Sequence, residues 1–191
     1  MAVDMLRVAI TPEVEHTEEA EWITAILDAG WDYVHLRHPG ATRRDMKRII
    51  EDVPQRHHGK LRLHGHLDLI YEFNLGGVHL NSRCPEIPEG YRGPVSRSCH
   101  SLEEIEAYPG CDYVTLSPVF DSVSKVGYRS AFTHEQLLGL PAGKVVALGG
   151  VVPERVPDLK RYAFAGYAVL GYLWSAPDKC ELSRRLREFE K

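Results

Sequence analysis

The sequence contains no long apolar run. None of its hydrophobic segments approaches the roughly 20 residues that a membrane-spanning helix needs, and the N-terminus lacks a basic segment followed by a long apolar one. A secretory signal and a membrane anchor are therefore not expected. We predict a cytoplasmic protein with no membrane partner.

Cysteine is scarce and follows no pattern. The four cysteines, Cys84, Cys99, Cys111 and Cys180, show no C-x-x-C spacing. A thiolate zinc site or a redox pair is usually recognised by that spacing. Each cysteine is therefore interpreted as a reduced thiol of the core or the surface.

The sequence also lacks an excess of positive charge and a linker. Its 23 Lys and Arg residues are outnumbered by 27 Asp and Glu residues, which gives a net charge of -4. Non-specific binding to nucleic acid depends on bulk positive charge, so we expect no nucleic-acid partner and only local anion sites. Because no Pro-, Gly- or Ser-rich linker interrupts it, we predict that the whole chain, residues 1–191, forms one domain.

Short apolar segments alternate along the chain with amphipathic ones. The alternation predicts eight strands separated by helices, which is the pattern of repeated βα units. Eight such units close into a (β/α)8 TIM barrel, and an open doubly wound sheet is the alternative. The predicted strands are Leu6–Thr11, Tyr33–Arg37, Leu61–His64, Gly77–Leu80, Val95–Ser98, Val114–Leu116, Lys144–Leu148 and Ala168–Gly171.

The chain is short for this fold, whose typical size is about 250 residues. Helices and loops must therefore be trimmed, and the Pro- and Gly-rich segment 84–94 predicts a loop in place of the helix after strand four. Helix starts are predicted at Thr17, Thr42, Ser101 and Thr133 from N-cap and capping-box patterns.

Glycines follow the last two predicted strands. In such barrels the C-terminal strand ends form the working face, and phosphate commonly binds in the loops after strands seven and eight. Gly149, Gly150 and Gly171 fall in these loops, where a missing Cβ lets backbone N–H groups approach phosphate oxygens. Their joint placement predicts a phosphate site.

The loop after strand six is rich in serine and ends in a lysine. Ser122, Ser124 and Lys125 offer hydroxyls and a positive charge to an anion. Together with the glycine loops, they predict small-molecule phosphates or pyrophosphates as ligands.

Strand two carries an imidazole and a guanidinium near its end. Because side chains alternate along a strand, His35 and Arg37 are expected to share one face. An inward arginine can grip a phosphate or pyrophosphate with two hydrogen bonds. Pairing of Arg37 with a carboxylate of the barrel is an equally supported interpretation.

Further polar side chains follow strands three to five. His64, His66 and His79 raise the question of a metal site, but the histidines lack a tight ligand spacing and an H-x-H pair alone is weak evidence. We therefore assign no metal ligand and interpret these imidazoles as packed or solvated. Ser98 and His100 at the end of strand five could hydrogen-bond a heteroaromatic substrate.

Six segments carry motifs in a characteristic order. They are VHLRHPG at 34–40, GGVHLNSR at 76–83, SCHSLEE at 98–104, CDYVTLSPVFDSVSK at 111–125, VVALGGV at 145–151 and FAGYAVLG at 164–171. The order resembles the thiamine-phosphate synthase and thiazole tautomerase superfamily over nearly the whole chain. The most specific part is the fourth segment, which is similar to the Ser/Thr-rich loop with a final lysine in the synthases.

The resemblance implies a (β/α)8 barrel and a transferase of thiamine biosynthesis. In the implied reaction, hydroxymethylpyrimidine pyrophosphate ionises, and the nitrogen of a thiazole phosphate captures the pyrimidine cation. Thiamine phosphate and pyrophosphate result. Carried over by position, Lys125 and Arg37 would hold the leaving pyrophosphate, and His35 stands where the family usually has a glutamine.

The resemblance also implies where the two substrates bind. Ser98 and His100 match the S-x-H segment beside the pyrimidine. Gly149 and Gly150 match the loop that holds the thiazole phosphate, and Gly171 lies in the neighbouring loop.

The sequence departs from the family at the metal. The resemblance leads us to expect Mg²⁺, but His64 and Asn81 lie in the motifs that carry its aspartates, and Pro39 replaces a lysine. Imidazole suits Mg²⁺ poorly. His66 and Arg83 are gained where acids are lost, and they could supply positive charge to the leaving group instead.

Two other functions remain open at this level. A thiazole tautomerase-like isomerase is disfavoured because Pro118 stands where its motif has an acid/base histidine. A non-catalytic or regulatory binder of thiamine precursors would explain the missing carboxylates. A homo-oligomer is compatible with the sequence.

Overall fold

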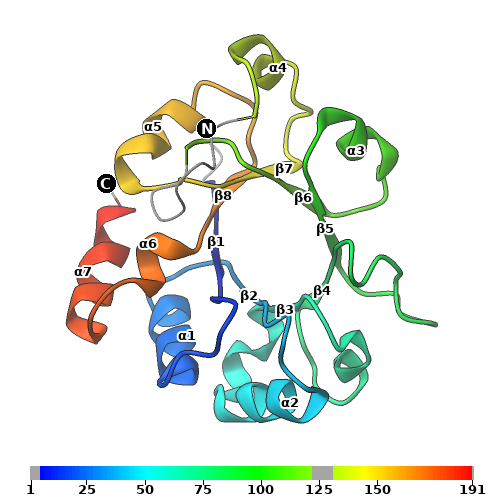
Figure 1. Cartoon of the computed structure of the whole chain (residues 1–191), viewed down its shortest axis with the longest axis vertical. Coiled ribbons are helices and arrows are strands. Elements are labelled where there is room, and N and C mark those ends of the chain that lie inside the picture. The colour runs from blue at the N-terminus through cyan, green and yellow to red at the C-terminus, as the bar shows by residue number, and fades with distance from the viewer. Residues whose placement is uncertain (1–4, 122–130, 191) are drawn as a thin grey trace.

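Eight parallel strands form a closed barrel. The computed structural model describes residues 5–121 and 131–190. Each strand pairs with its neighbour in chain order, and β8 pairs with β1 to close the ring (Figure 1). The predicted TIM barrel is therefore confirmed, and the open sheet is wrong. The strands are β1 Leu6–Ile10, β2 Tyr33–Leu36, β3 Leu61–Leu63, β4 Gly77–Leu80, β5 Val95–Cys99, β6 Tyr113–Leu116, β7 Val145–Leu148 and β8 Gly166–Val169.

Short helices surround the barrel. The α-helices are α1 Glu19–Asp28, α2 Arg43–Asp52, α3 Leu102–Ala107, α4 His134–Leu138, α5 Val156–Leu159, α6 Gly171–Trp174 and α7 Lys179–Glu188, with 3₁₀ turns at Gln55–Lys60, Leu67–Tyr71 and Pro153–Arg155. Among them α1, α2 and α7 have 10 residues each, and the other α-helices have six or fewer. Residues 81–94 contain no helix, as predicted. Trimmed helices thus explain how a short chain completes this fold.

Three of the four predicted helix starts are confirmed. Thr42 and Thr133 form capping boxes with Asp45 and Gln136. Ser101 accepts a hydrogen bond from the N–H of Glu104. The Glu104 carboxylate accepts from the N–H of His100 instead of from that of Ser101. These caps are local in sequence, and sequence patterns therefore find them.

The predicted cap at Thr17 is wrong. Helix α1 begins at Glu19 after Glu18, with no side-chain cap. The Glu19 carboxylate accepts a hydrogen bond from the N–H of His16 and also contacts His38 of the next βα unit. A tertiary contact, which no local pattern reveals, therefore helps to fix this helix start.

The last predicted strand is displaced by two residues. Strand β8 covers Gly166–Val169, and Gly171 begins α6 instead of ending the strand. Gly166 pairs with Leu6 of β1, and a Cβ on this glycine would lie 2.3 Å from the Leu6 carbonyl oxygen. Barrel closure therefore requires a close approach of two backbones, and this glycine permits it.

The interior of the barrel has an apolar side and a polar side. Val8, Ile10, Val146 and Ala168, from β1, β7 and β8, pack together with the ring of Tyr113. The opposite side consists of polar side chains of β2 to β5, all buried, and these are His35, Arg62, His79 and Ser96. The polar side is where the barrel can bind a ligand.

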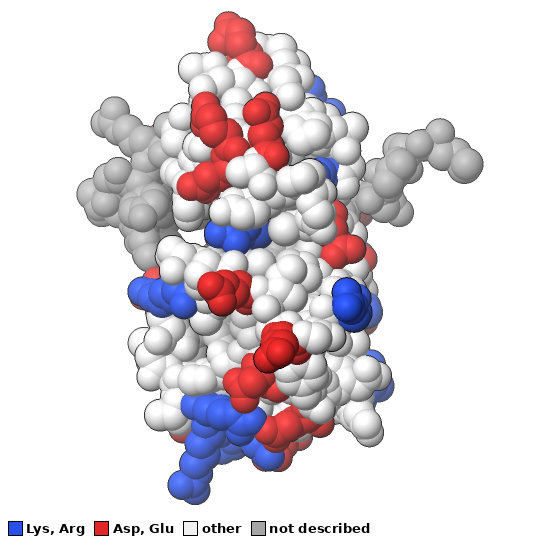
Figure 2. All heavy atoms as spheres, turned by 90° about the vertical axis from the view of Figure 1, so that its right-hand side faces the viewer, with Lys and Arg blue, Asp and Glu red and all other residues white. Residues whose placement is uncertain are grey.

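The molecular surface carries charges of both signs. Figure 2 shows acidic and basic side chains spread over one face, with the basic ones in separate groups. None of the helices in the described residues is long and apolar enough to cross a bilayer.

Candidate active site

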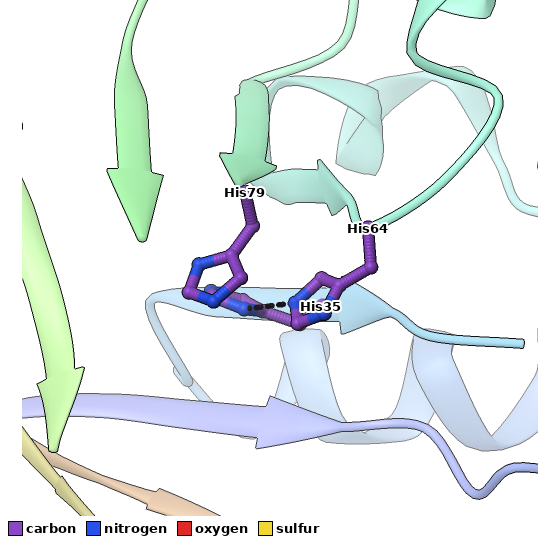
Figure 3. Close-up of side chains that lie close together, drawn as sticks. All are labelled: His35, His64 and His79. Carbon is purple, nitrogen blue, oxygen red and sulfur yellow. Dashed lines mark hydrogen bonds between the residues drawn. The ribbon is translucent and has the colours of Figure 1, made fainter. Parts of the chain in front are cut away.

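Three imidazoles meet inside the barrel. His35 lies on β2, His64 directly follows β3, and His79 lies on β4 (Figure 3). His35 Nδ1 is 2.8 Å from His64 Nε2, and the rings of His64 and His79 stack at 4.1 Å. The sequence-based interpretation of these histidines as packed or solvated side chains therefore changes, because the three rings form one cluster.

The cluster is oriented by hydroxyls of two neighbouring strands. Tyr113 on β6 contacts His35 Nε2 at 2.6 Å. Ser96 and Ser98 on β5 contact Nδ1 and Nε2 of His79 at 2.8 and 2.9 Å. Ser98, a predicted substrate contact, therefore lies at the cluster.

Burial keeps the imidazoles neutral. Loss of hydration lowers the pKa of His35 and His64 well below the usual value, and repulsion from His79 lowers both further. Burial, together with the nearby charge of Arg62, lowers the pKa of His79 to about 3. At neutral pH the cluster therefore offers uncharged nitrogen lone pairs.

Arg62 and two tyrosines lie next to the cluster. The guanidinium of Arg62 is buried 4.1 Å above the ring of Tyr33, which stacks on Tyr113. Burial raises the pKa of Tyr113 to about 12, so its hydroxyl stays protonated. We did not predict Arg62 or Tyr113 from the sequence, although their alternation with buried apolar residues in LRL and YVTL marks them as inward-facing.

Arg37 is held at the rim by a carboxylate. Its Nη1 lies 3.1 Å from Glu13 Oε1, in the loop after β1, and its backbone N–H donates to Thr11 Oγ1 at 2.8 Å. The carboxylate-paired interpretation is therefore the observed one. The guanidinium still lies at the C-terminal ends of the strands, because Arg37 directly follows β2.

A second pair, which is buried, supports the same rim. His38 Nε2 contacts Glu19 Oε1 at 2.6 Å and Thr11 Oγ1 at 3.2 Å, and both side chains of the His38–Glu19 pair are 2% exposed. Because Thr11 also binds the backbone of Arg37, this pair fixes the loop that presents the guanidinium. We did not predict it, since its partners are distant in sequence.

Replacing Glu19 with leucine is expected to destabilise the protein by about 3 kcal/mol, because a buried imidazole nitrogen of His38 loses its carboxylate partner and keeps only the longer contact to Thr11. Glu19→Gln, which keeps an acceptor, should cost less than half as much. Urea denaturation at neutral pH measures both changes. Equal losses for the two variants would mean that packing, and not the hydrogen bond, sets the cost.

His100 lies outside the cluster. It is exposed, its Nδ1 lies 3.2 Å from the carbonyl oxygen and the hydroxyl of Ser117, and its backbone N–H donates to Glu104. The residue thus joins the end of β5 to the segment after β6.

The glycines after β7 form a tight corner. Gly149 and Gly150 have φ values of +97° and +65°. A Cβ at Gly149 would lie 2.9 Å from Pro118 Cα, and one at Gly150 would lie 2.2 Å from the Asp121 carbonyl oxygen. Arg155 binds the carbonyls of Gly150 and Asp121. The corner is therefore packed directly against the segment that leads into the serine-rich loop.

Two further predicted residues, His66 and Arg83, lie outside the cluster. His66 has a left-handed backbone and hydrogen-bonds the carbonyl of Ala41, and Arg83 lies in an exposed turn. Ser122, Ser124 and Lys125 lie outside the described residues.

The strand ends that should hold Mg²⁺ lack suitable ligands. In the described part of the chain, the group of metal-ligating side chains at this place consists of the imidazoles of His35, His64 and His79. Asn81 cannot stand in for a carboxylate, because its amide donates to the His64 carbonyl and its oxygen accepts from the N–H of Arg83. A hard cation that prefers oxygen ligands does not fit this donor set.

The sequence matches the family model described as thiamine monophosphate synthase over residues 7–173. The chain belongs to this family. Thiamine-phosphate synthases from Bacteroides fragilis and Cronobacter sakazakii are 24% and 28% identical to it, over 93% and 95% of this chain and 96% and 92% of theirs. The resemblance that the motifs indicated is thereby confirmed.

Structural similarity agrees with the sequence match. The crystal structure of a thiamine phosphate pyrophosphorylase from Bacteroides thetaiotaomicron superimposes with a TM-score of 0.87 at 33% identity, covering 98% of this chain and 96% of that one. The synthase relationship thus extends over the whole barrel, including the strands that carry the histidines.

Proposed function

We propose that this member of the thiamine monophosphate synthase family is a transferase that joins hydroxymethylpyrimidine pyrophosphate to thiazole phosphate. The match to the family model across residues 7–173 carries the proposal. In the reaction the C–O bond to pyrophosphate breaks, and the thiazole nitrogen forms the new C–N bond. The tautomerase and binder alternatives are not favoured, because the similar proteins are thiamine-phosphate synthases by name.

The two anionic groups are proposed to bind at separate sites around the barrel mouth. The thiazole phosphate would bind at the corner of Gly149 and Gly150, near the start of α6 at Gly171. The pyrophosphate would bind to Arg37 and to Lys125, with Ser122 and Ser124 as further donors. A cation matters there because negative charge develops on the leaving group.

The pyrimidine is proposed to bind between these two anion sites. Ser98 and His100 would hydrogen-bond the ring, and His35 would lie below it. Because its imidazoles are unprotonated, the cluster can donate or accept hydrogen bonds to the pyrimidine. The proposal treats residues 1–191 as one domain and leaves the oligomeric state open.

The test is a direct assay of the purified protein. Incubation with both substrates should give thiamine phosphate and pyrophosphate in equal amounts. Absence of product with Mg²⁺ or with Zn²⁺, combined with calorimetric binding of either substrate, would instead support the binder. Product formed in excess EDTA would show that cationic side chains replace the ion.

Replacing Arg37 with alanine is expected to raise the KM for the pyrophosphate substrate about 10-fold, the effect of about 1.4 kcal/mol of lost binding energy at a partly exposed ion pair. Arg43→Ala serves as a control, since Arg43 pairs with Asp68 and Glu72 on the outer surface. Initial rates at varied substrate concentration measure the effect. An unchanged KM would exclude Arg37 from the pyrophosphate site.

A further inference from the structure

The histidine cluster has the dimensions of a metal site. Its three ligand atoms all lie within 4.8 Å of one another, and His35 Nδ1 is 2.8 Å from His64 Nε2. Two nitrogens bound to a tetrahedral zinc ion at about 2.0 Å lie roughly 3.3 Å apart. This value lies between the 2.8 Å separation and the 4.8 Å limit, so small ring movements would create a common centre.

We propose that His35, His64 and His79 bind one divalent transition-metal ion of the zinc class at the mouth of the barrel. Imidazole is a ligand that zinc, cobalt, nickel and copper ions prefer, whereas Mg²⁺ prefers oxygen. The ion would thus occupy the strand ends at which the family's Mg²⁺ finds no carboxylate in this chain. The inference is independent of the proposed reaction, since it concerns binding of the metal alone.

The side chains around the cluster suit metal ligation. A ligating histidine normally donates the N–H of its other ring nitrogen to an oxygen, which fixes the tautomer and the ring orientation. His35 Nε2 faces Tyr113 Oη at 2.6 Å, and His79 Nδ1 faces Ser96 Oγ at 2.8 Å. The other nitrogen of His35, Nδ1, faces His64 Nε2, whereas His79 Nε2 contacts Ser98 Oγ, a contact that the ion would replace.

The ion would be incompletely coordinated at a buried site. All three imidazoles are buried. Three protein ligands leave at least one position for water or for an oxygen of an anion, as in catalytic zinc sites. The hydroxyl of Ser98, 2.9 Å from His79 Nε2, lies beside that position.

Arg62 limits the affinity. Its buried guanidinium repels an added proton on His79, and it must also repel a dication. The described cluster contains no carboxylate that could compensate. We therefore expect affinity below that of structural zinc sites, with a Kd for Zn²⁺ of about 1 µM.

Chelator-treated protein titrated with Zn²⁺ alone tests the proposal by calorimetry. One ion should bind per chain, and Co²⁺ in its place should give the visible d–d absorption of a low-coordinate site. His35→Gln and His64→Gln should each weaken binding at least 100-fold, and Tyr113→Phe about 10-fold. Millimolar Mg²⁺ should not compete.

The matched control is His66→Gln, because His66 is two residues from His64 but hydrogen-bonds the Ala41 carbonyl. It should bind Zn²⁺ as the unmodified protein does. Thermal melting separates loss of the site from misfolding, since Zn²⁺ should raise the Tm of the unmodified protein and of His66→Gln but not of a folded His35→Gln. Absence of saturable binding, or binding that survives both ligand substitutions, would overturn the proposal.

Discussion

Gly150→Ala is expected to lower kcat/KM by at least about 100-fold, which corresponds to about 2.7 kcal/mol of lost transition-state stabilisation. The new Cβ would lie 2.2 Å from the Asp121 carbonyl oxygen, and the φ of +65° is unfavourable for alanine. Because Arg155 binds the carbonyls of both Gly150 and Asp121, the corner and the segment after β6 must move together. The two proposed anion sites are thus disturbed by one substitution.

The control for this substitution is Gly110→Ala, where a Cβ would meet nothing within 4 Å. It should retain activity within about twofold, because ordinary surface substitutions cost less than 0.5 kcal/mol. Steady-state kinetics with circular dichroism and melting curves distinguish a displaced corner from unfolding. A folded Gly150→Ala protein with near-normal turnover would remove the corner from the site.

Chelator-treated protein is expected to lose stability as the pH falls below about 6.5, the usual pKa of histidine. The folded protein keeps His79 unprotonated down to a pKa of about 3, whereas the unfolded chain takes up the proton near pH 6.5. Between these values each such histidine costs about 1.4 kcal/mol per pH unit on acidification. Above pH 6.5 His79 is neutral in both the folded and the unfolded chain, so it does not contribute to the pH dependence of stability.

His35 and His64 should add to this slope, because burial lowers their pKa values as well. Among the described residues, the titratable and charged groups around His79 are His35, His64, Arg62 and Arg97, and Tyr113 contacts His35. None of them carries a negative charge that would stabilise the imidazolium. The pH therefore acts on the cluster as a whole.

Urea denaturation between pH 7.5 and 5.5 measures the slope in a range where most carboxylates remain ionised. His79→Gln should flatten the dependence, and His134→Gln, which changes an exposed histidine, should not. Equal stability at pH 7.5 and pH 5.5 would contradict this prediction and would mean that the cluster opens to water on protonation.

The fold was predictable because its signals are local and repeated. Alternating apolar and amphipathic segments predict βα units, and the capping boxes at Thr42 and Thr133 depend only on residues three positions apart. The start of α1 was not predictable in this way, because the Glu19 carboxylate contacts His38 in another unit. The displaced β8 has the same cause, since its pairing partner Leu6 lies at the other end of the chain.

The sequence singled out the three histidines of the candidate site but not Arg62 or Tyr113, and it did not predict the geometry. Alternation predicts that His35 and Arg37 share a face, yet the strand ends before Arg37, and Glu13 holds the guanidinium at the rim. Convergence of His35, His64 and His79 depends on the stagger between strands, in which His35 pairs with Arg62, two residues before His64. Strand stagger is set by barrel closure, which single-strand patterns do not contain.

The division of the barrel interior has a consequence for how this scaffold can diverge. One uninterrupted stretch of chain, residues 33–99, supplies the polar side through β2 to β5, while the glycine corner belongs to the second half of the sequence. Exchanging that stretch for the corresponding one of a relative would change the chemistry at the centre, and the Arg37 contact with it, without altering the corner at which we propose that the thiazole phosphate binds. The two properties can therefore evolve, or be engineered, separately.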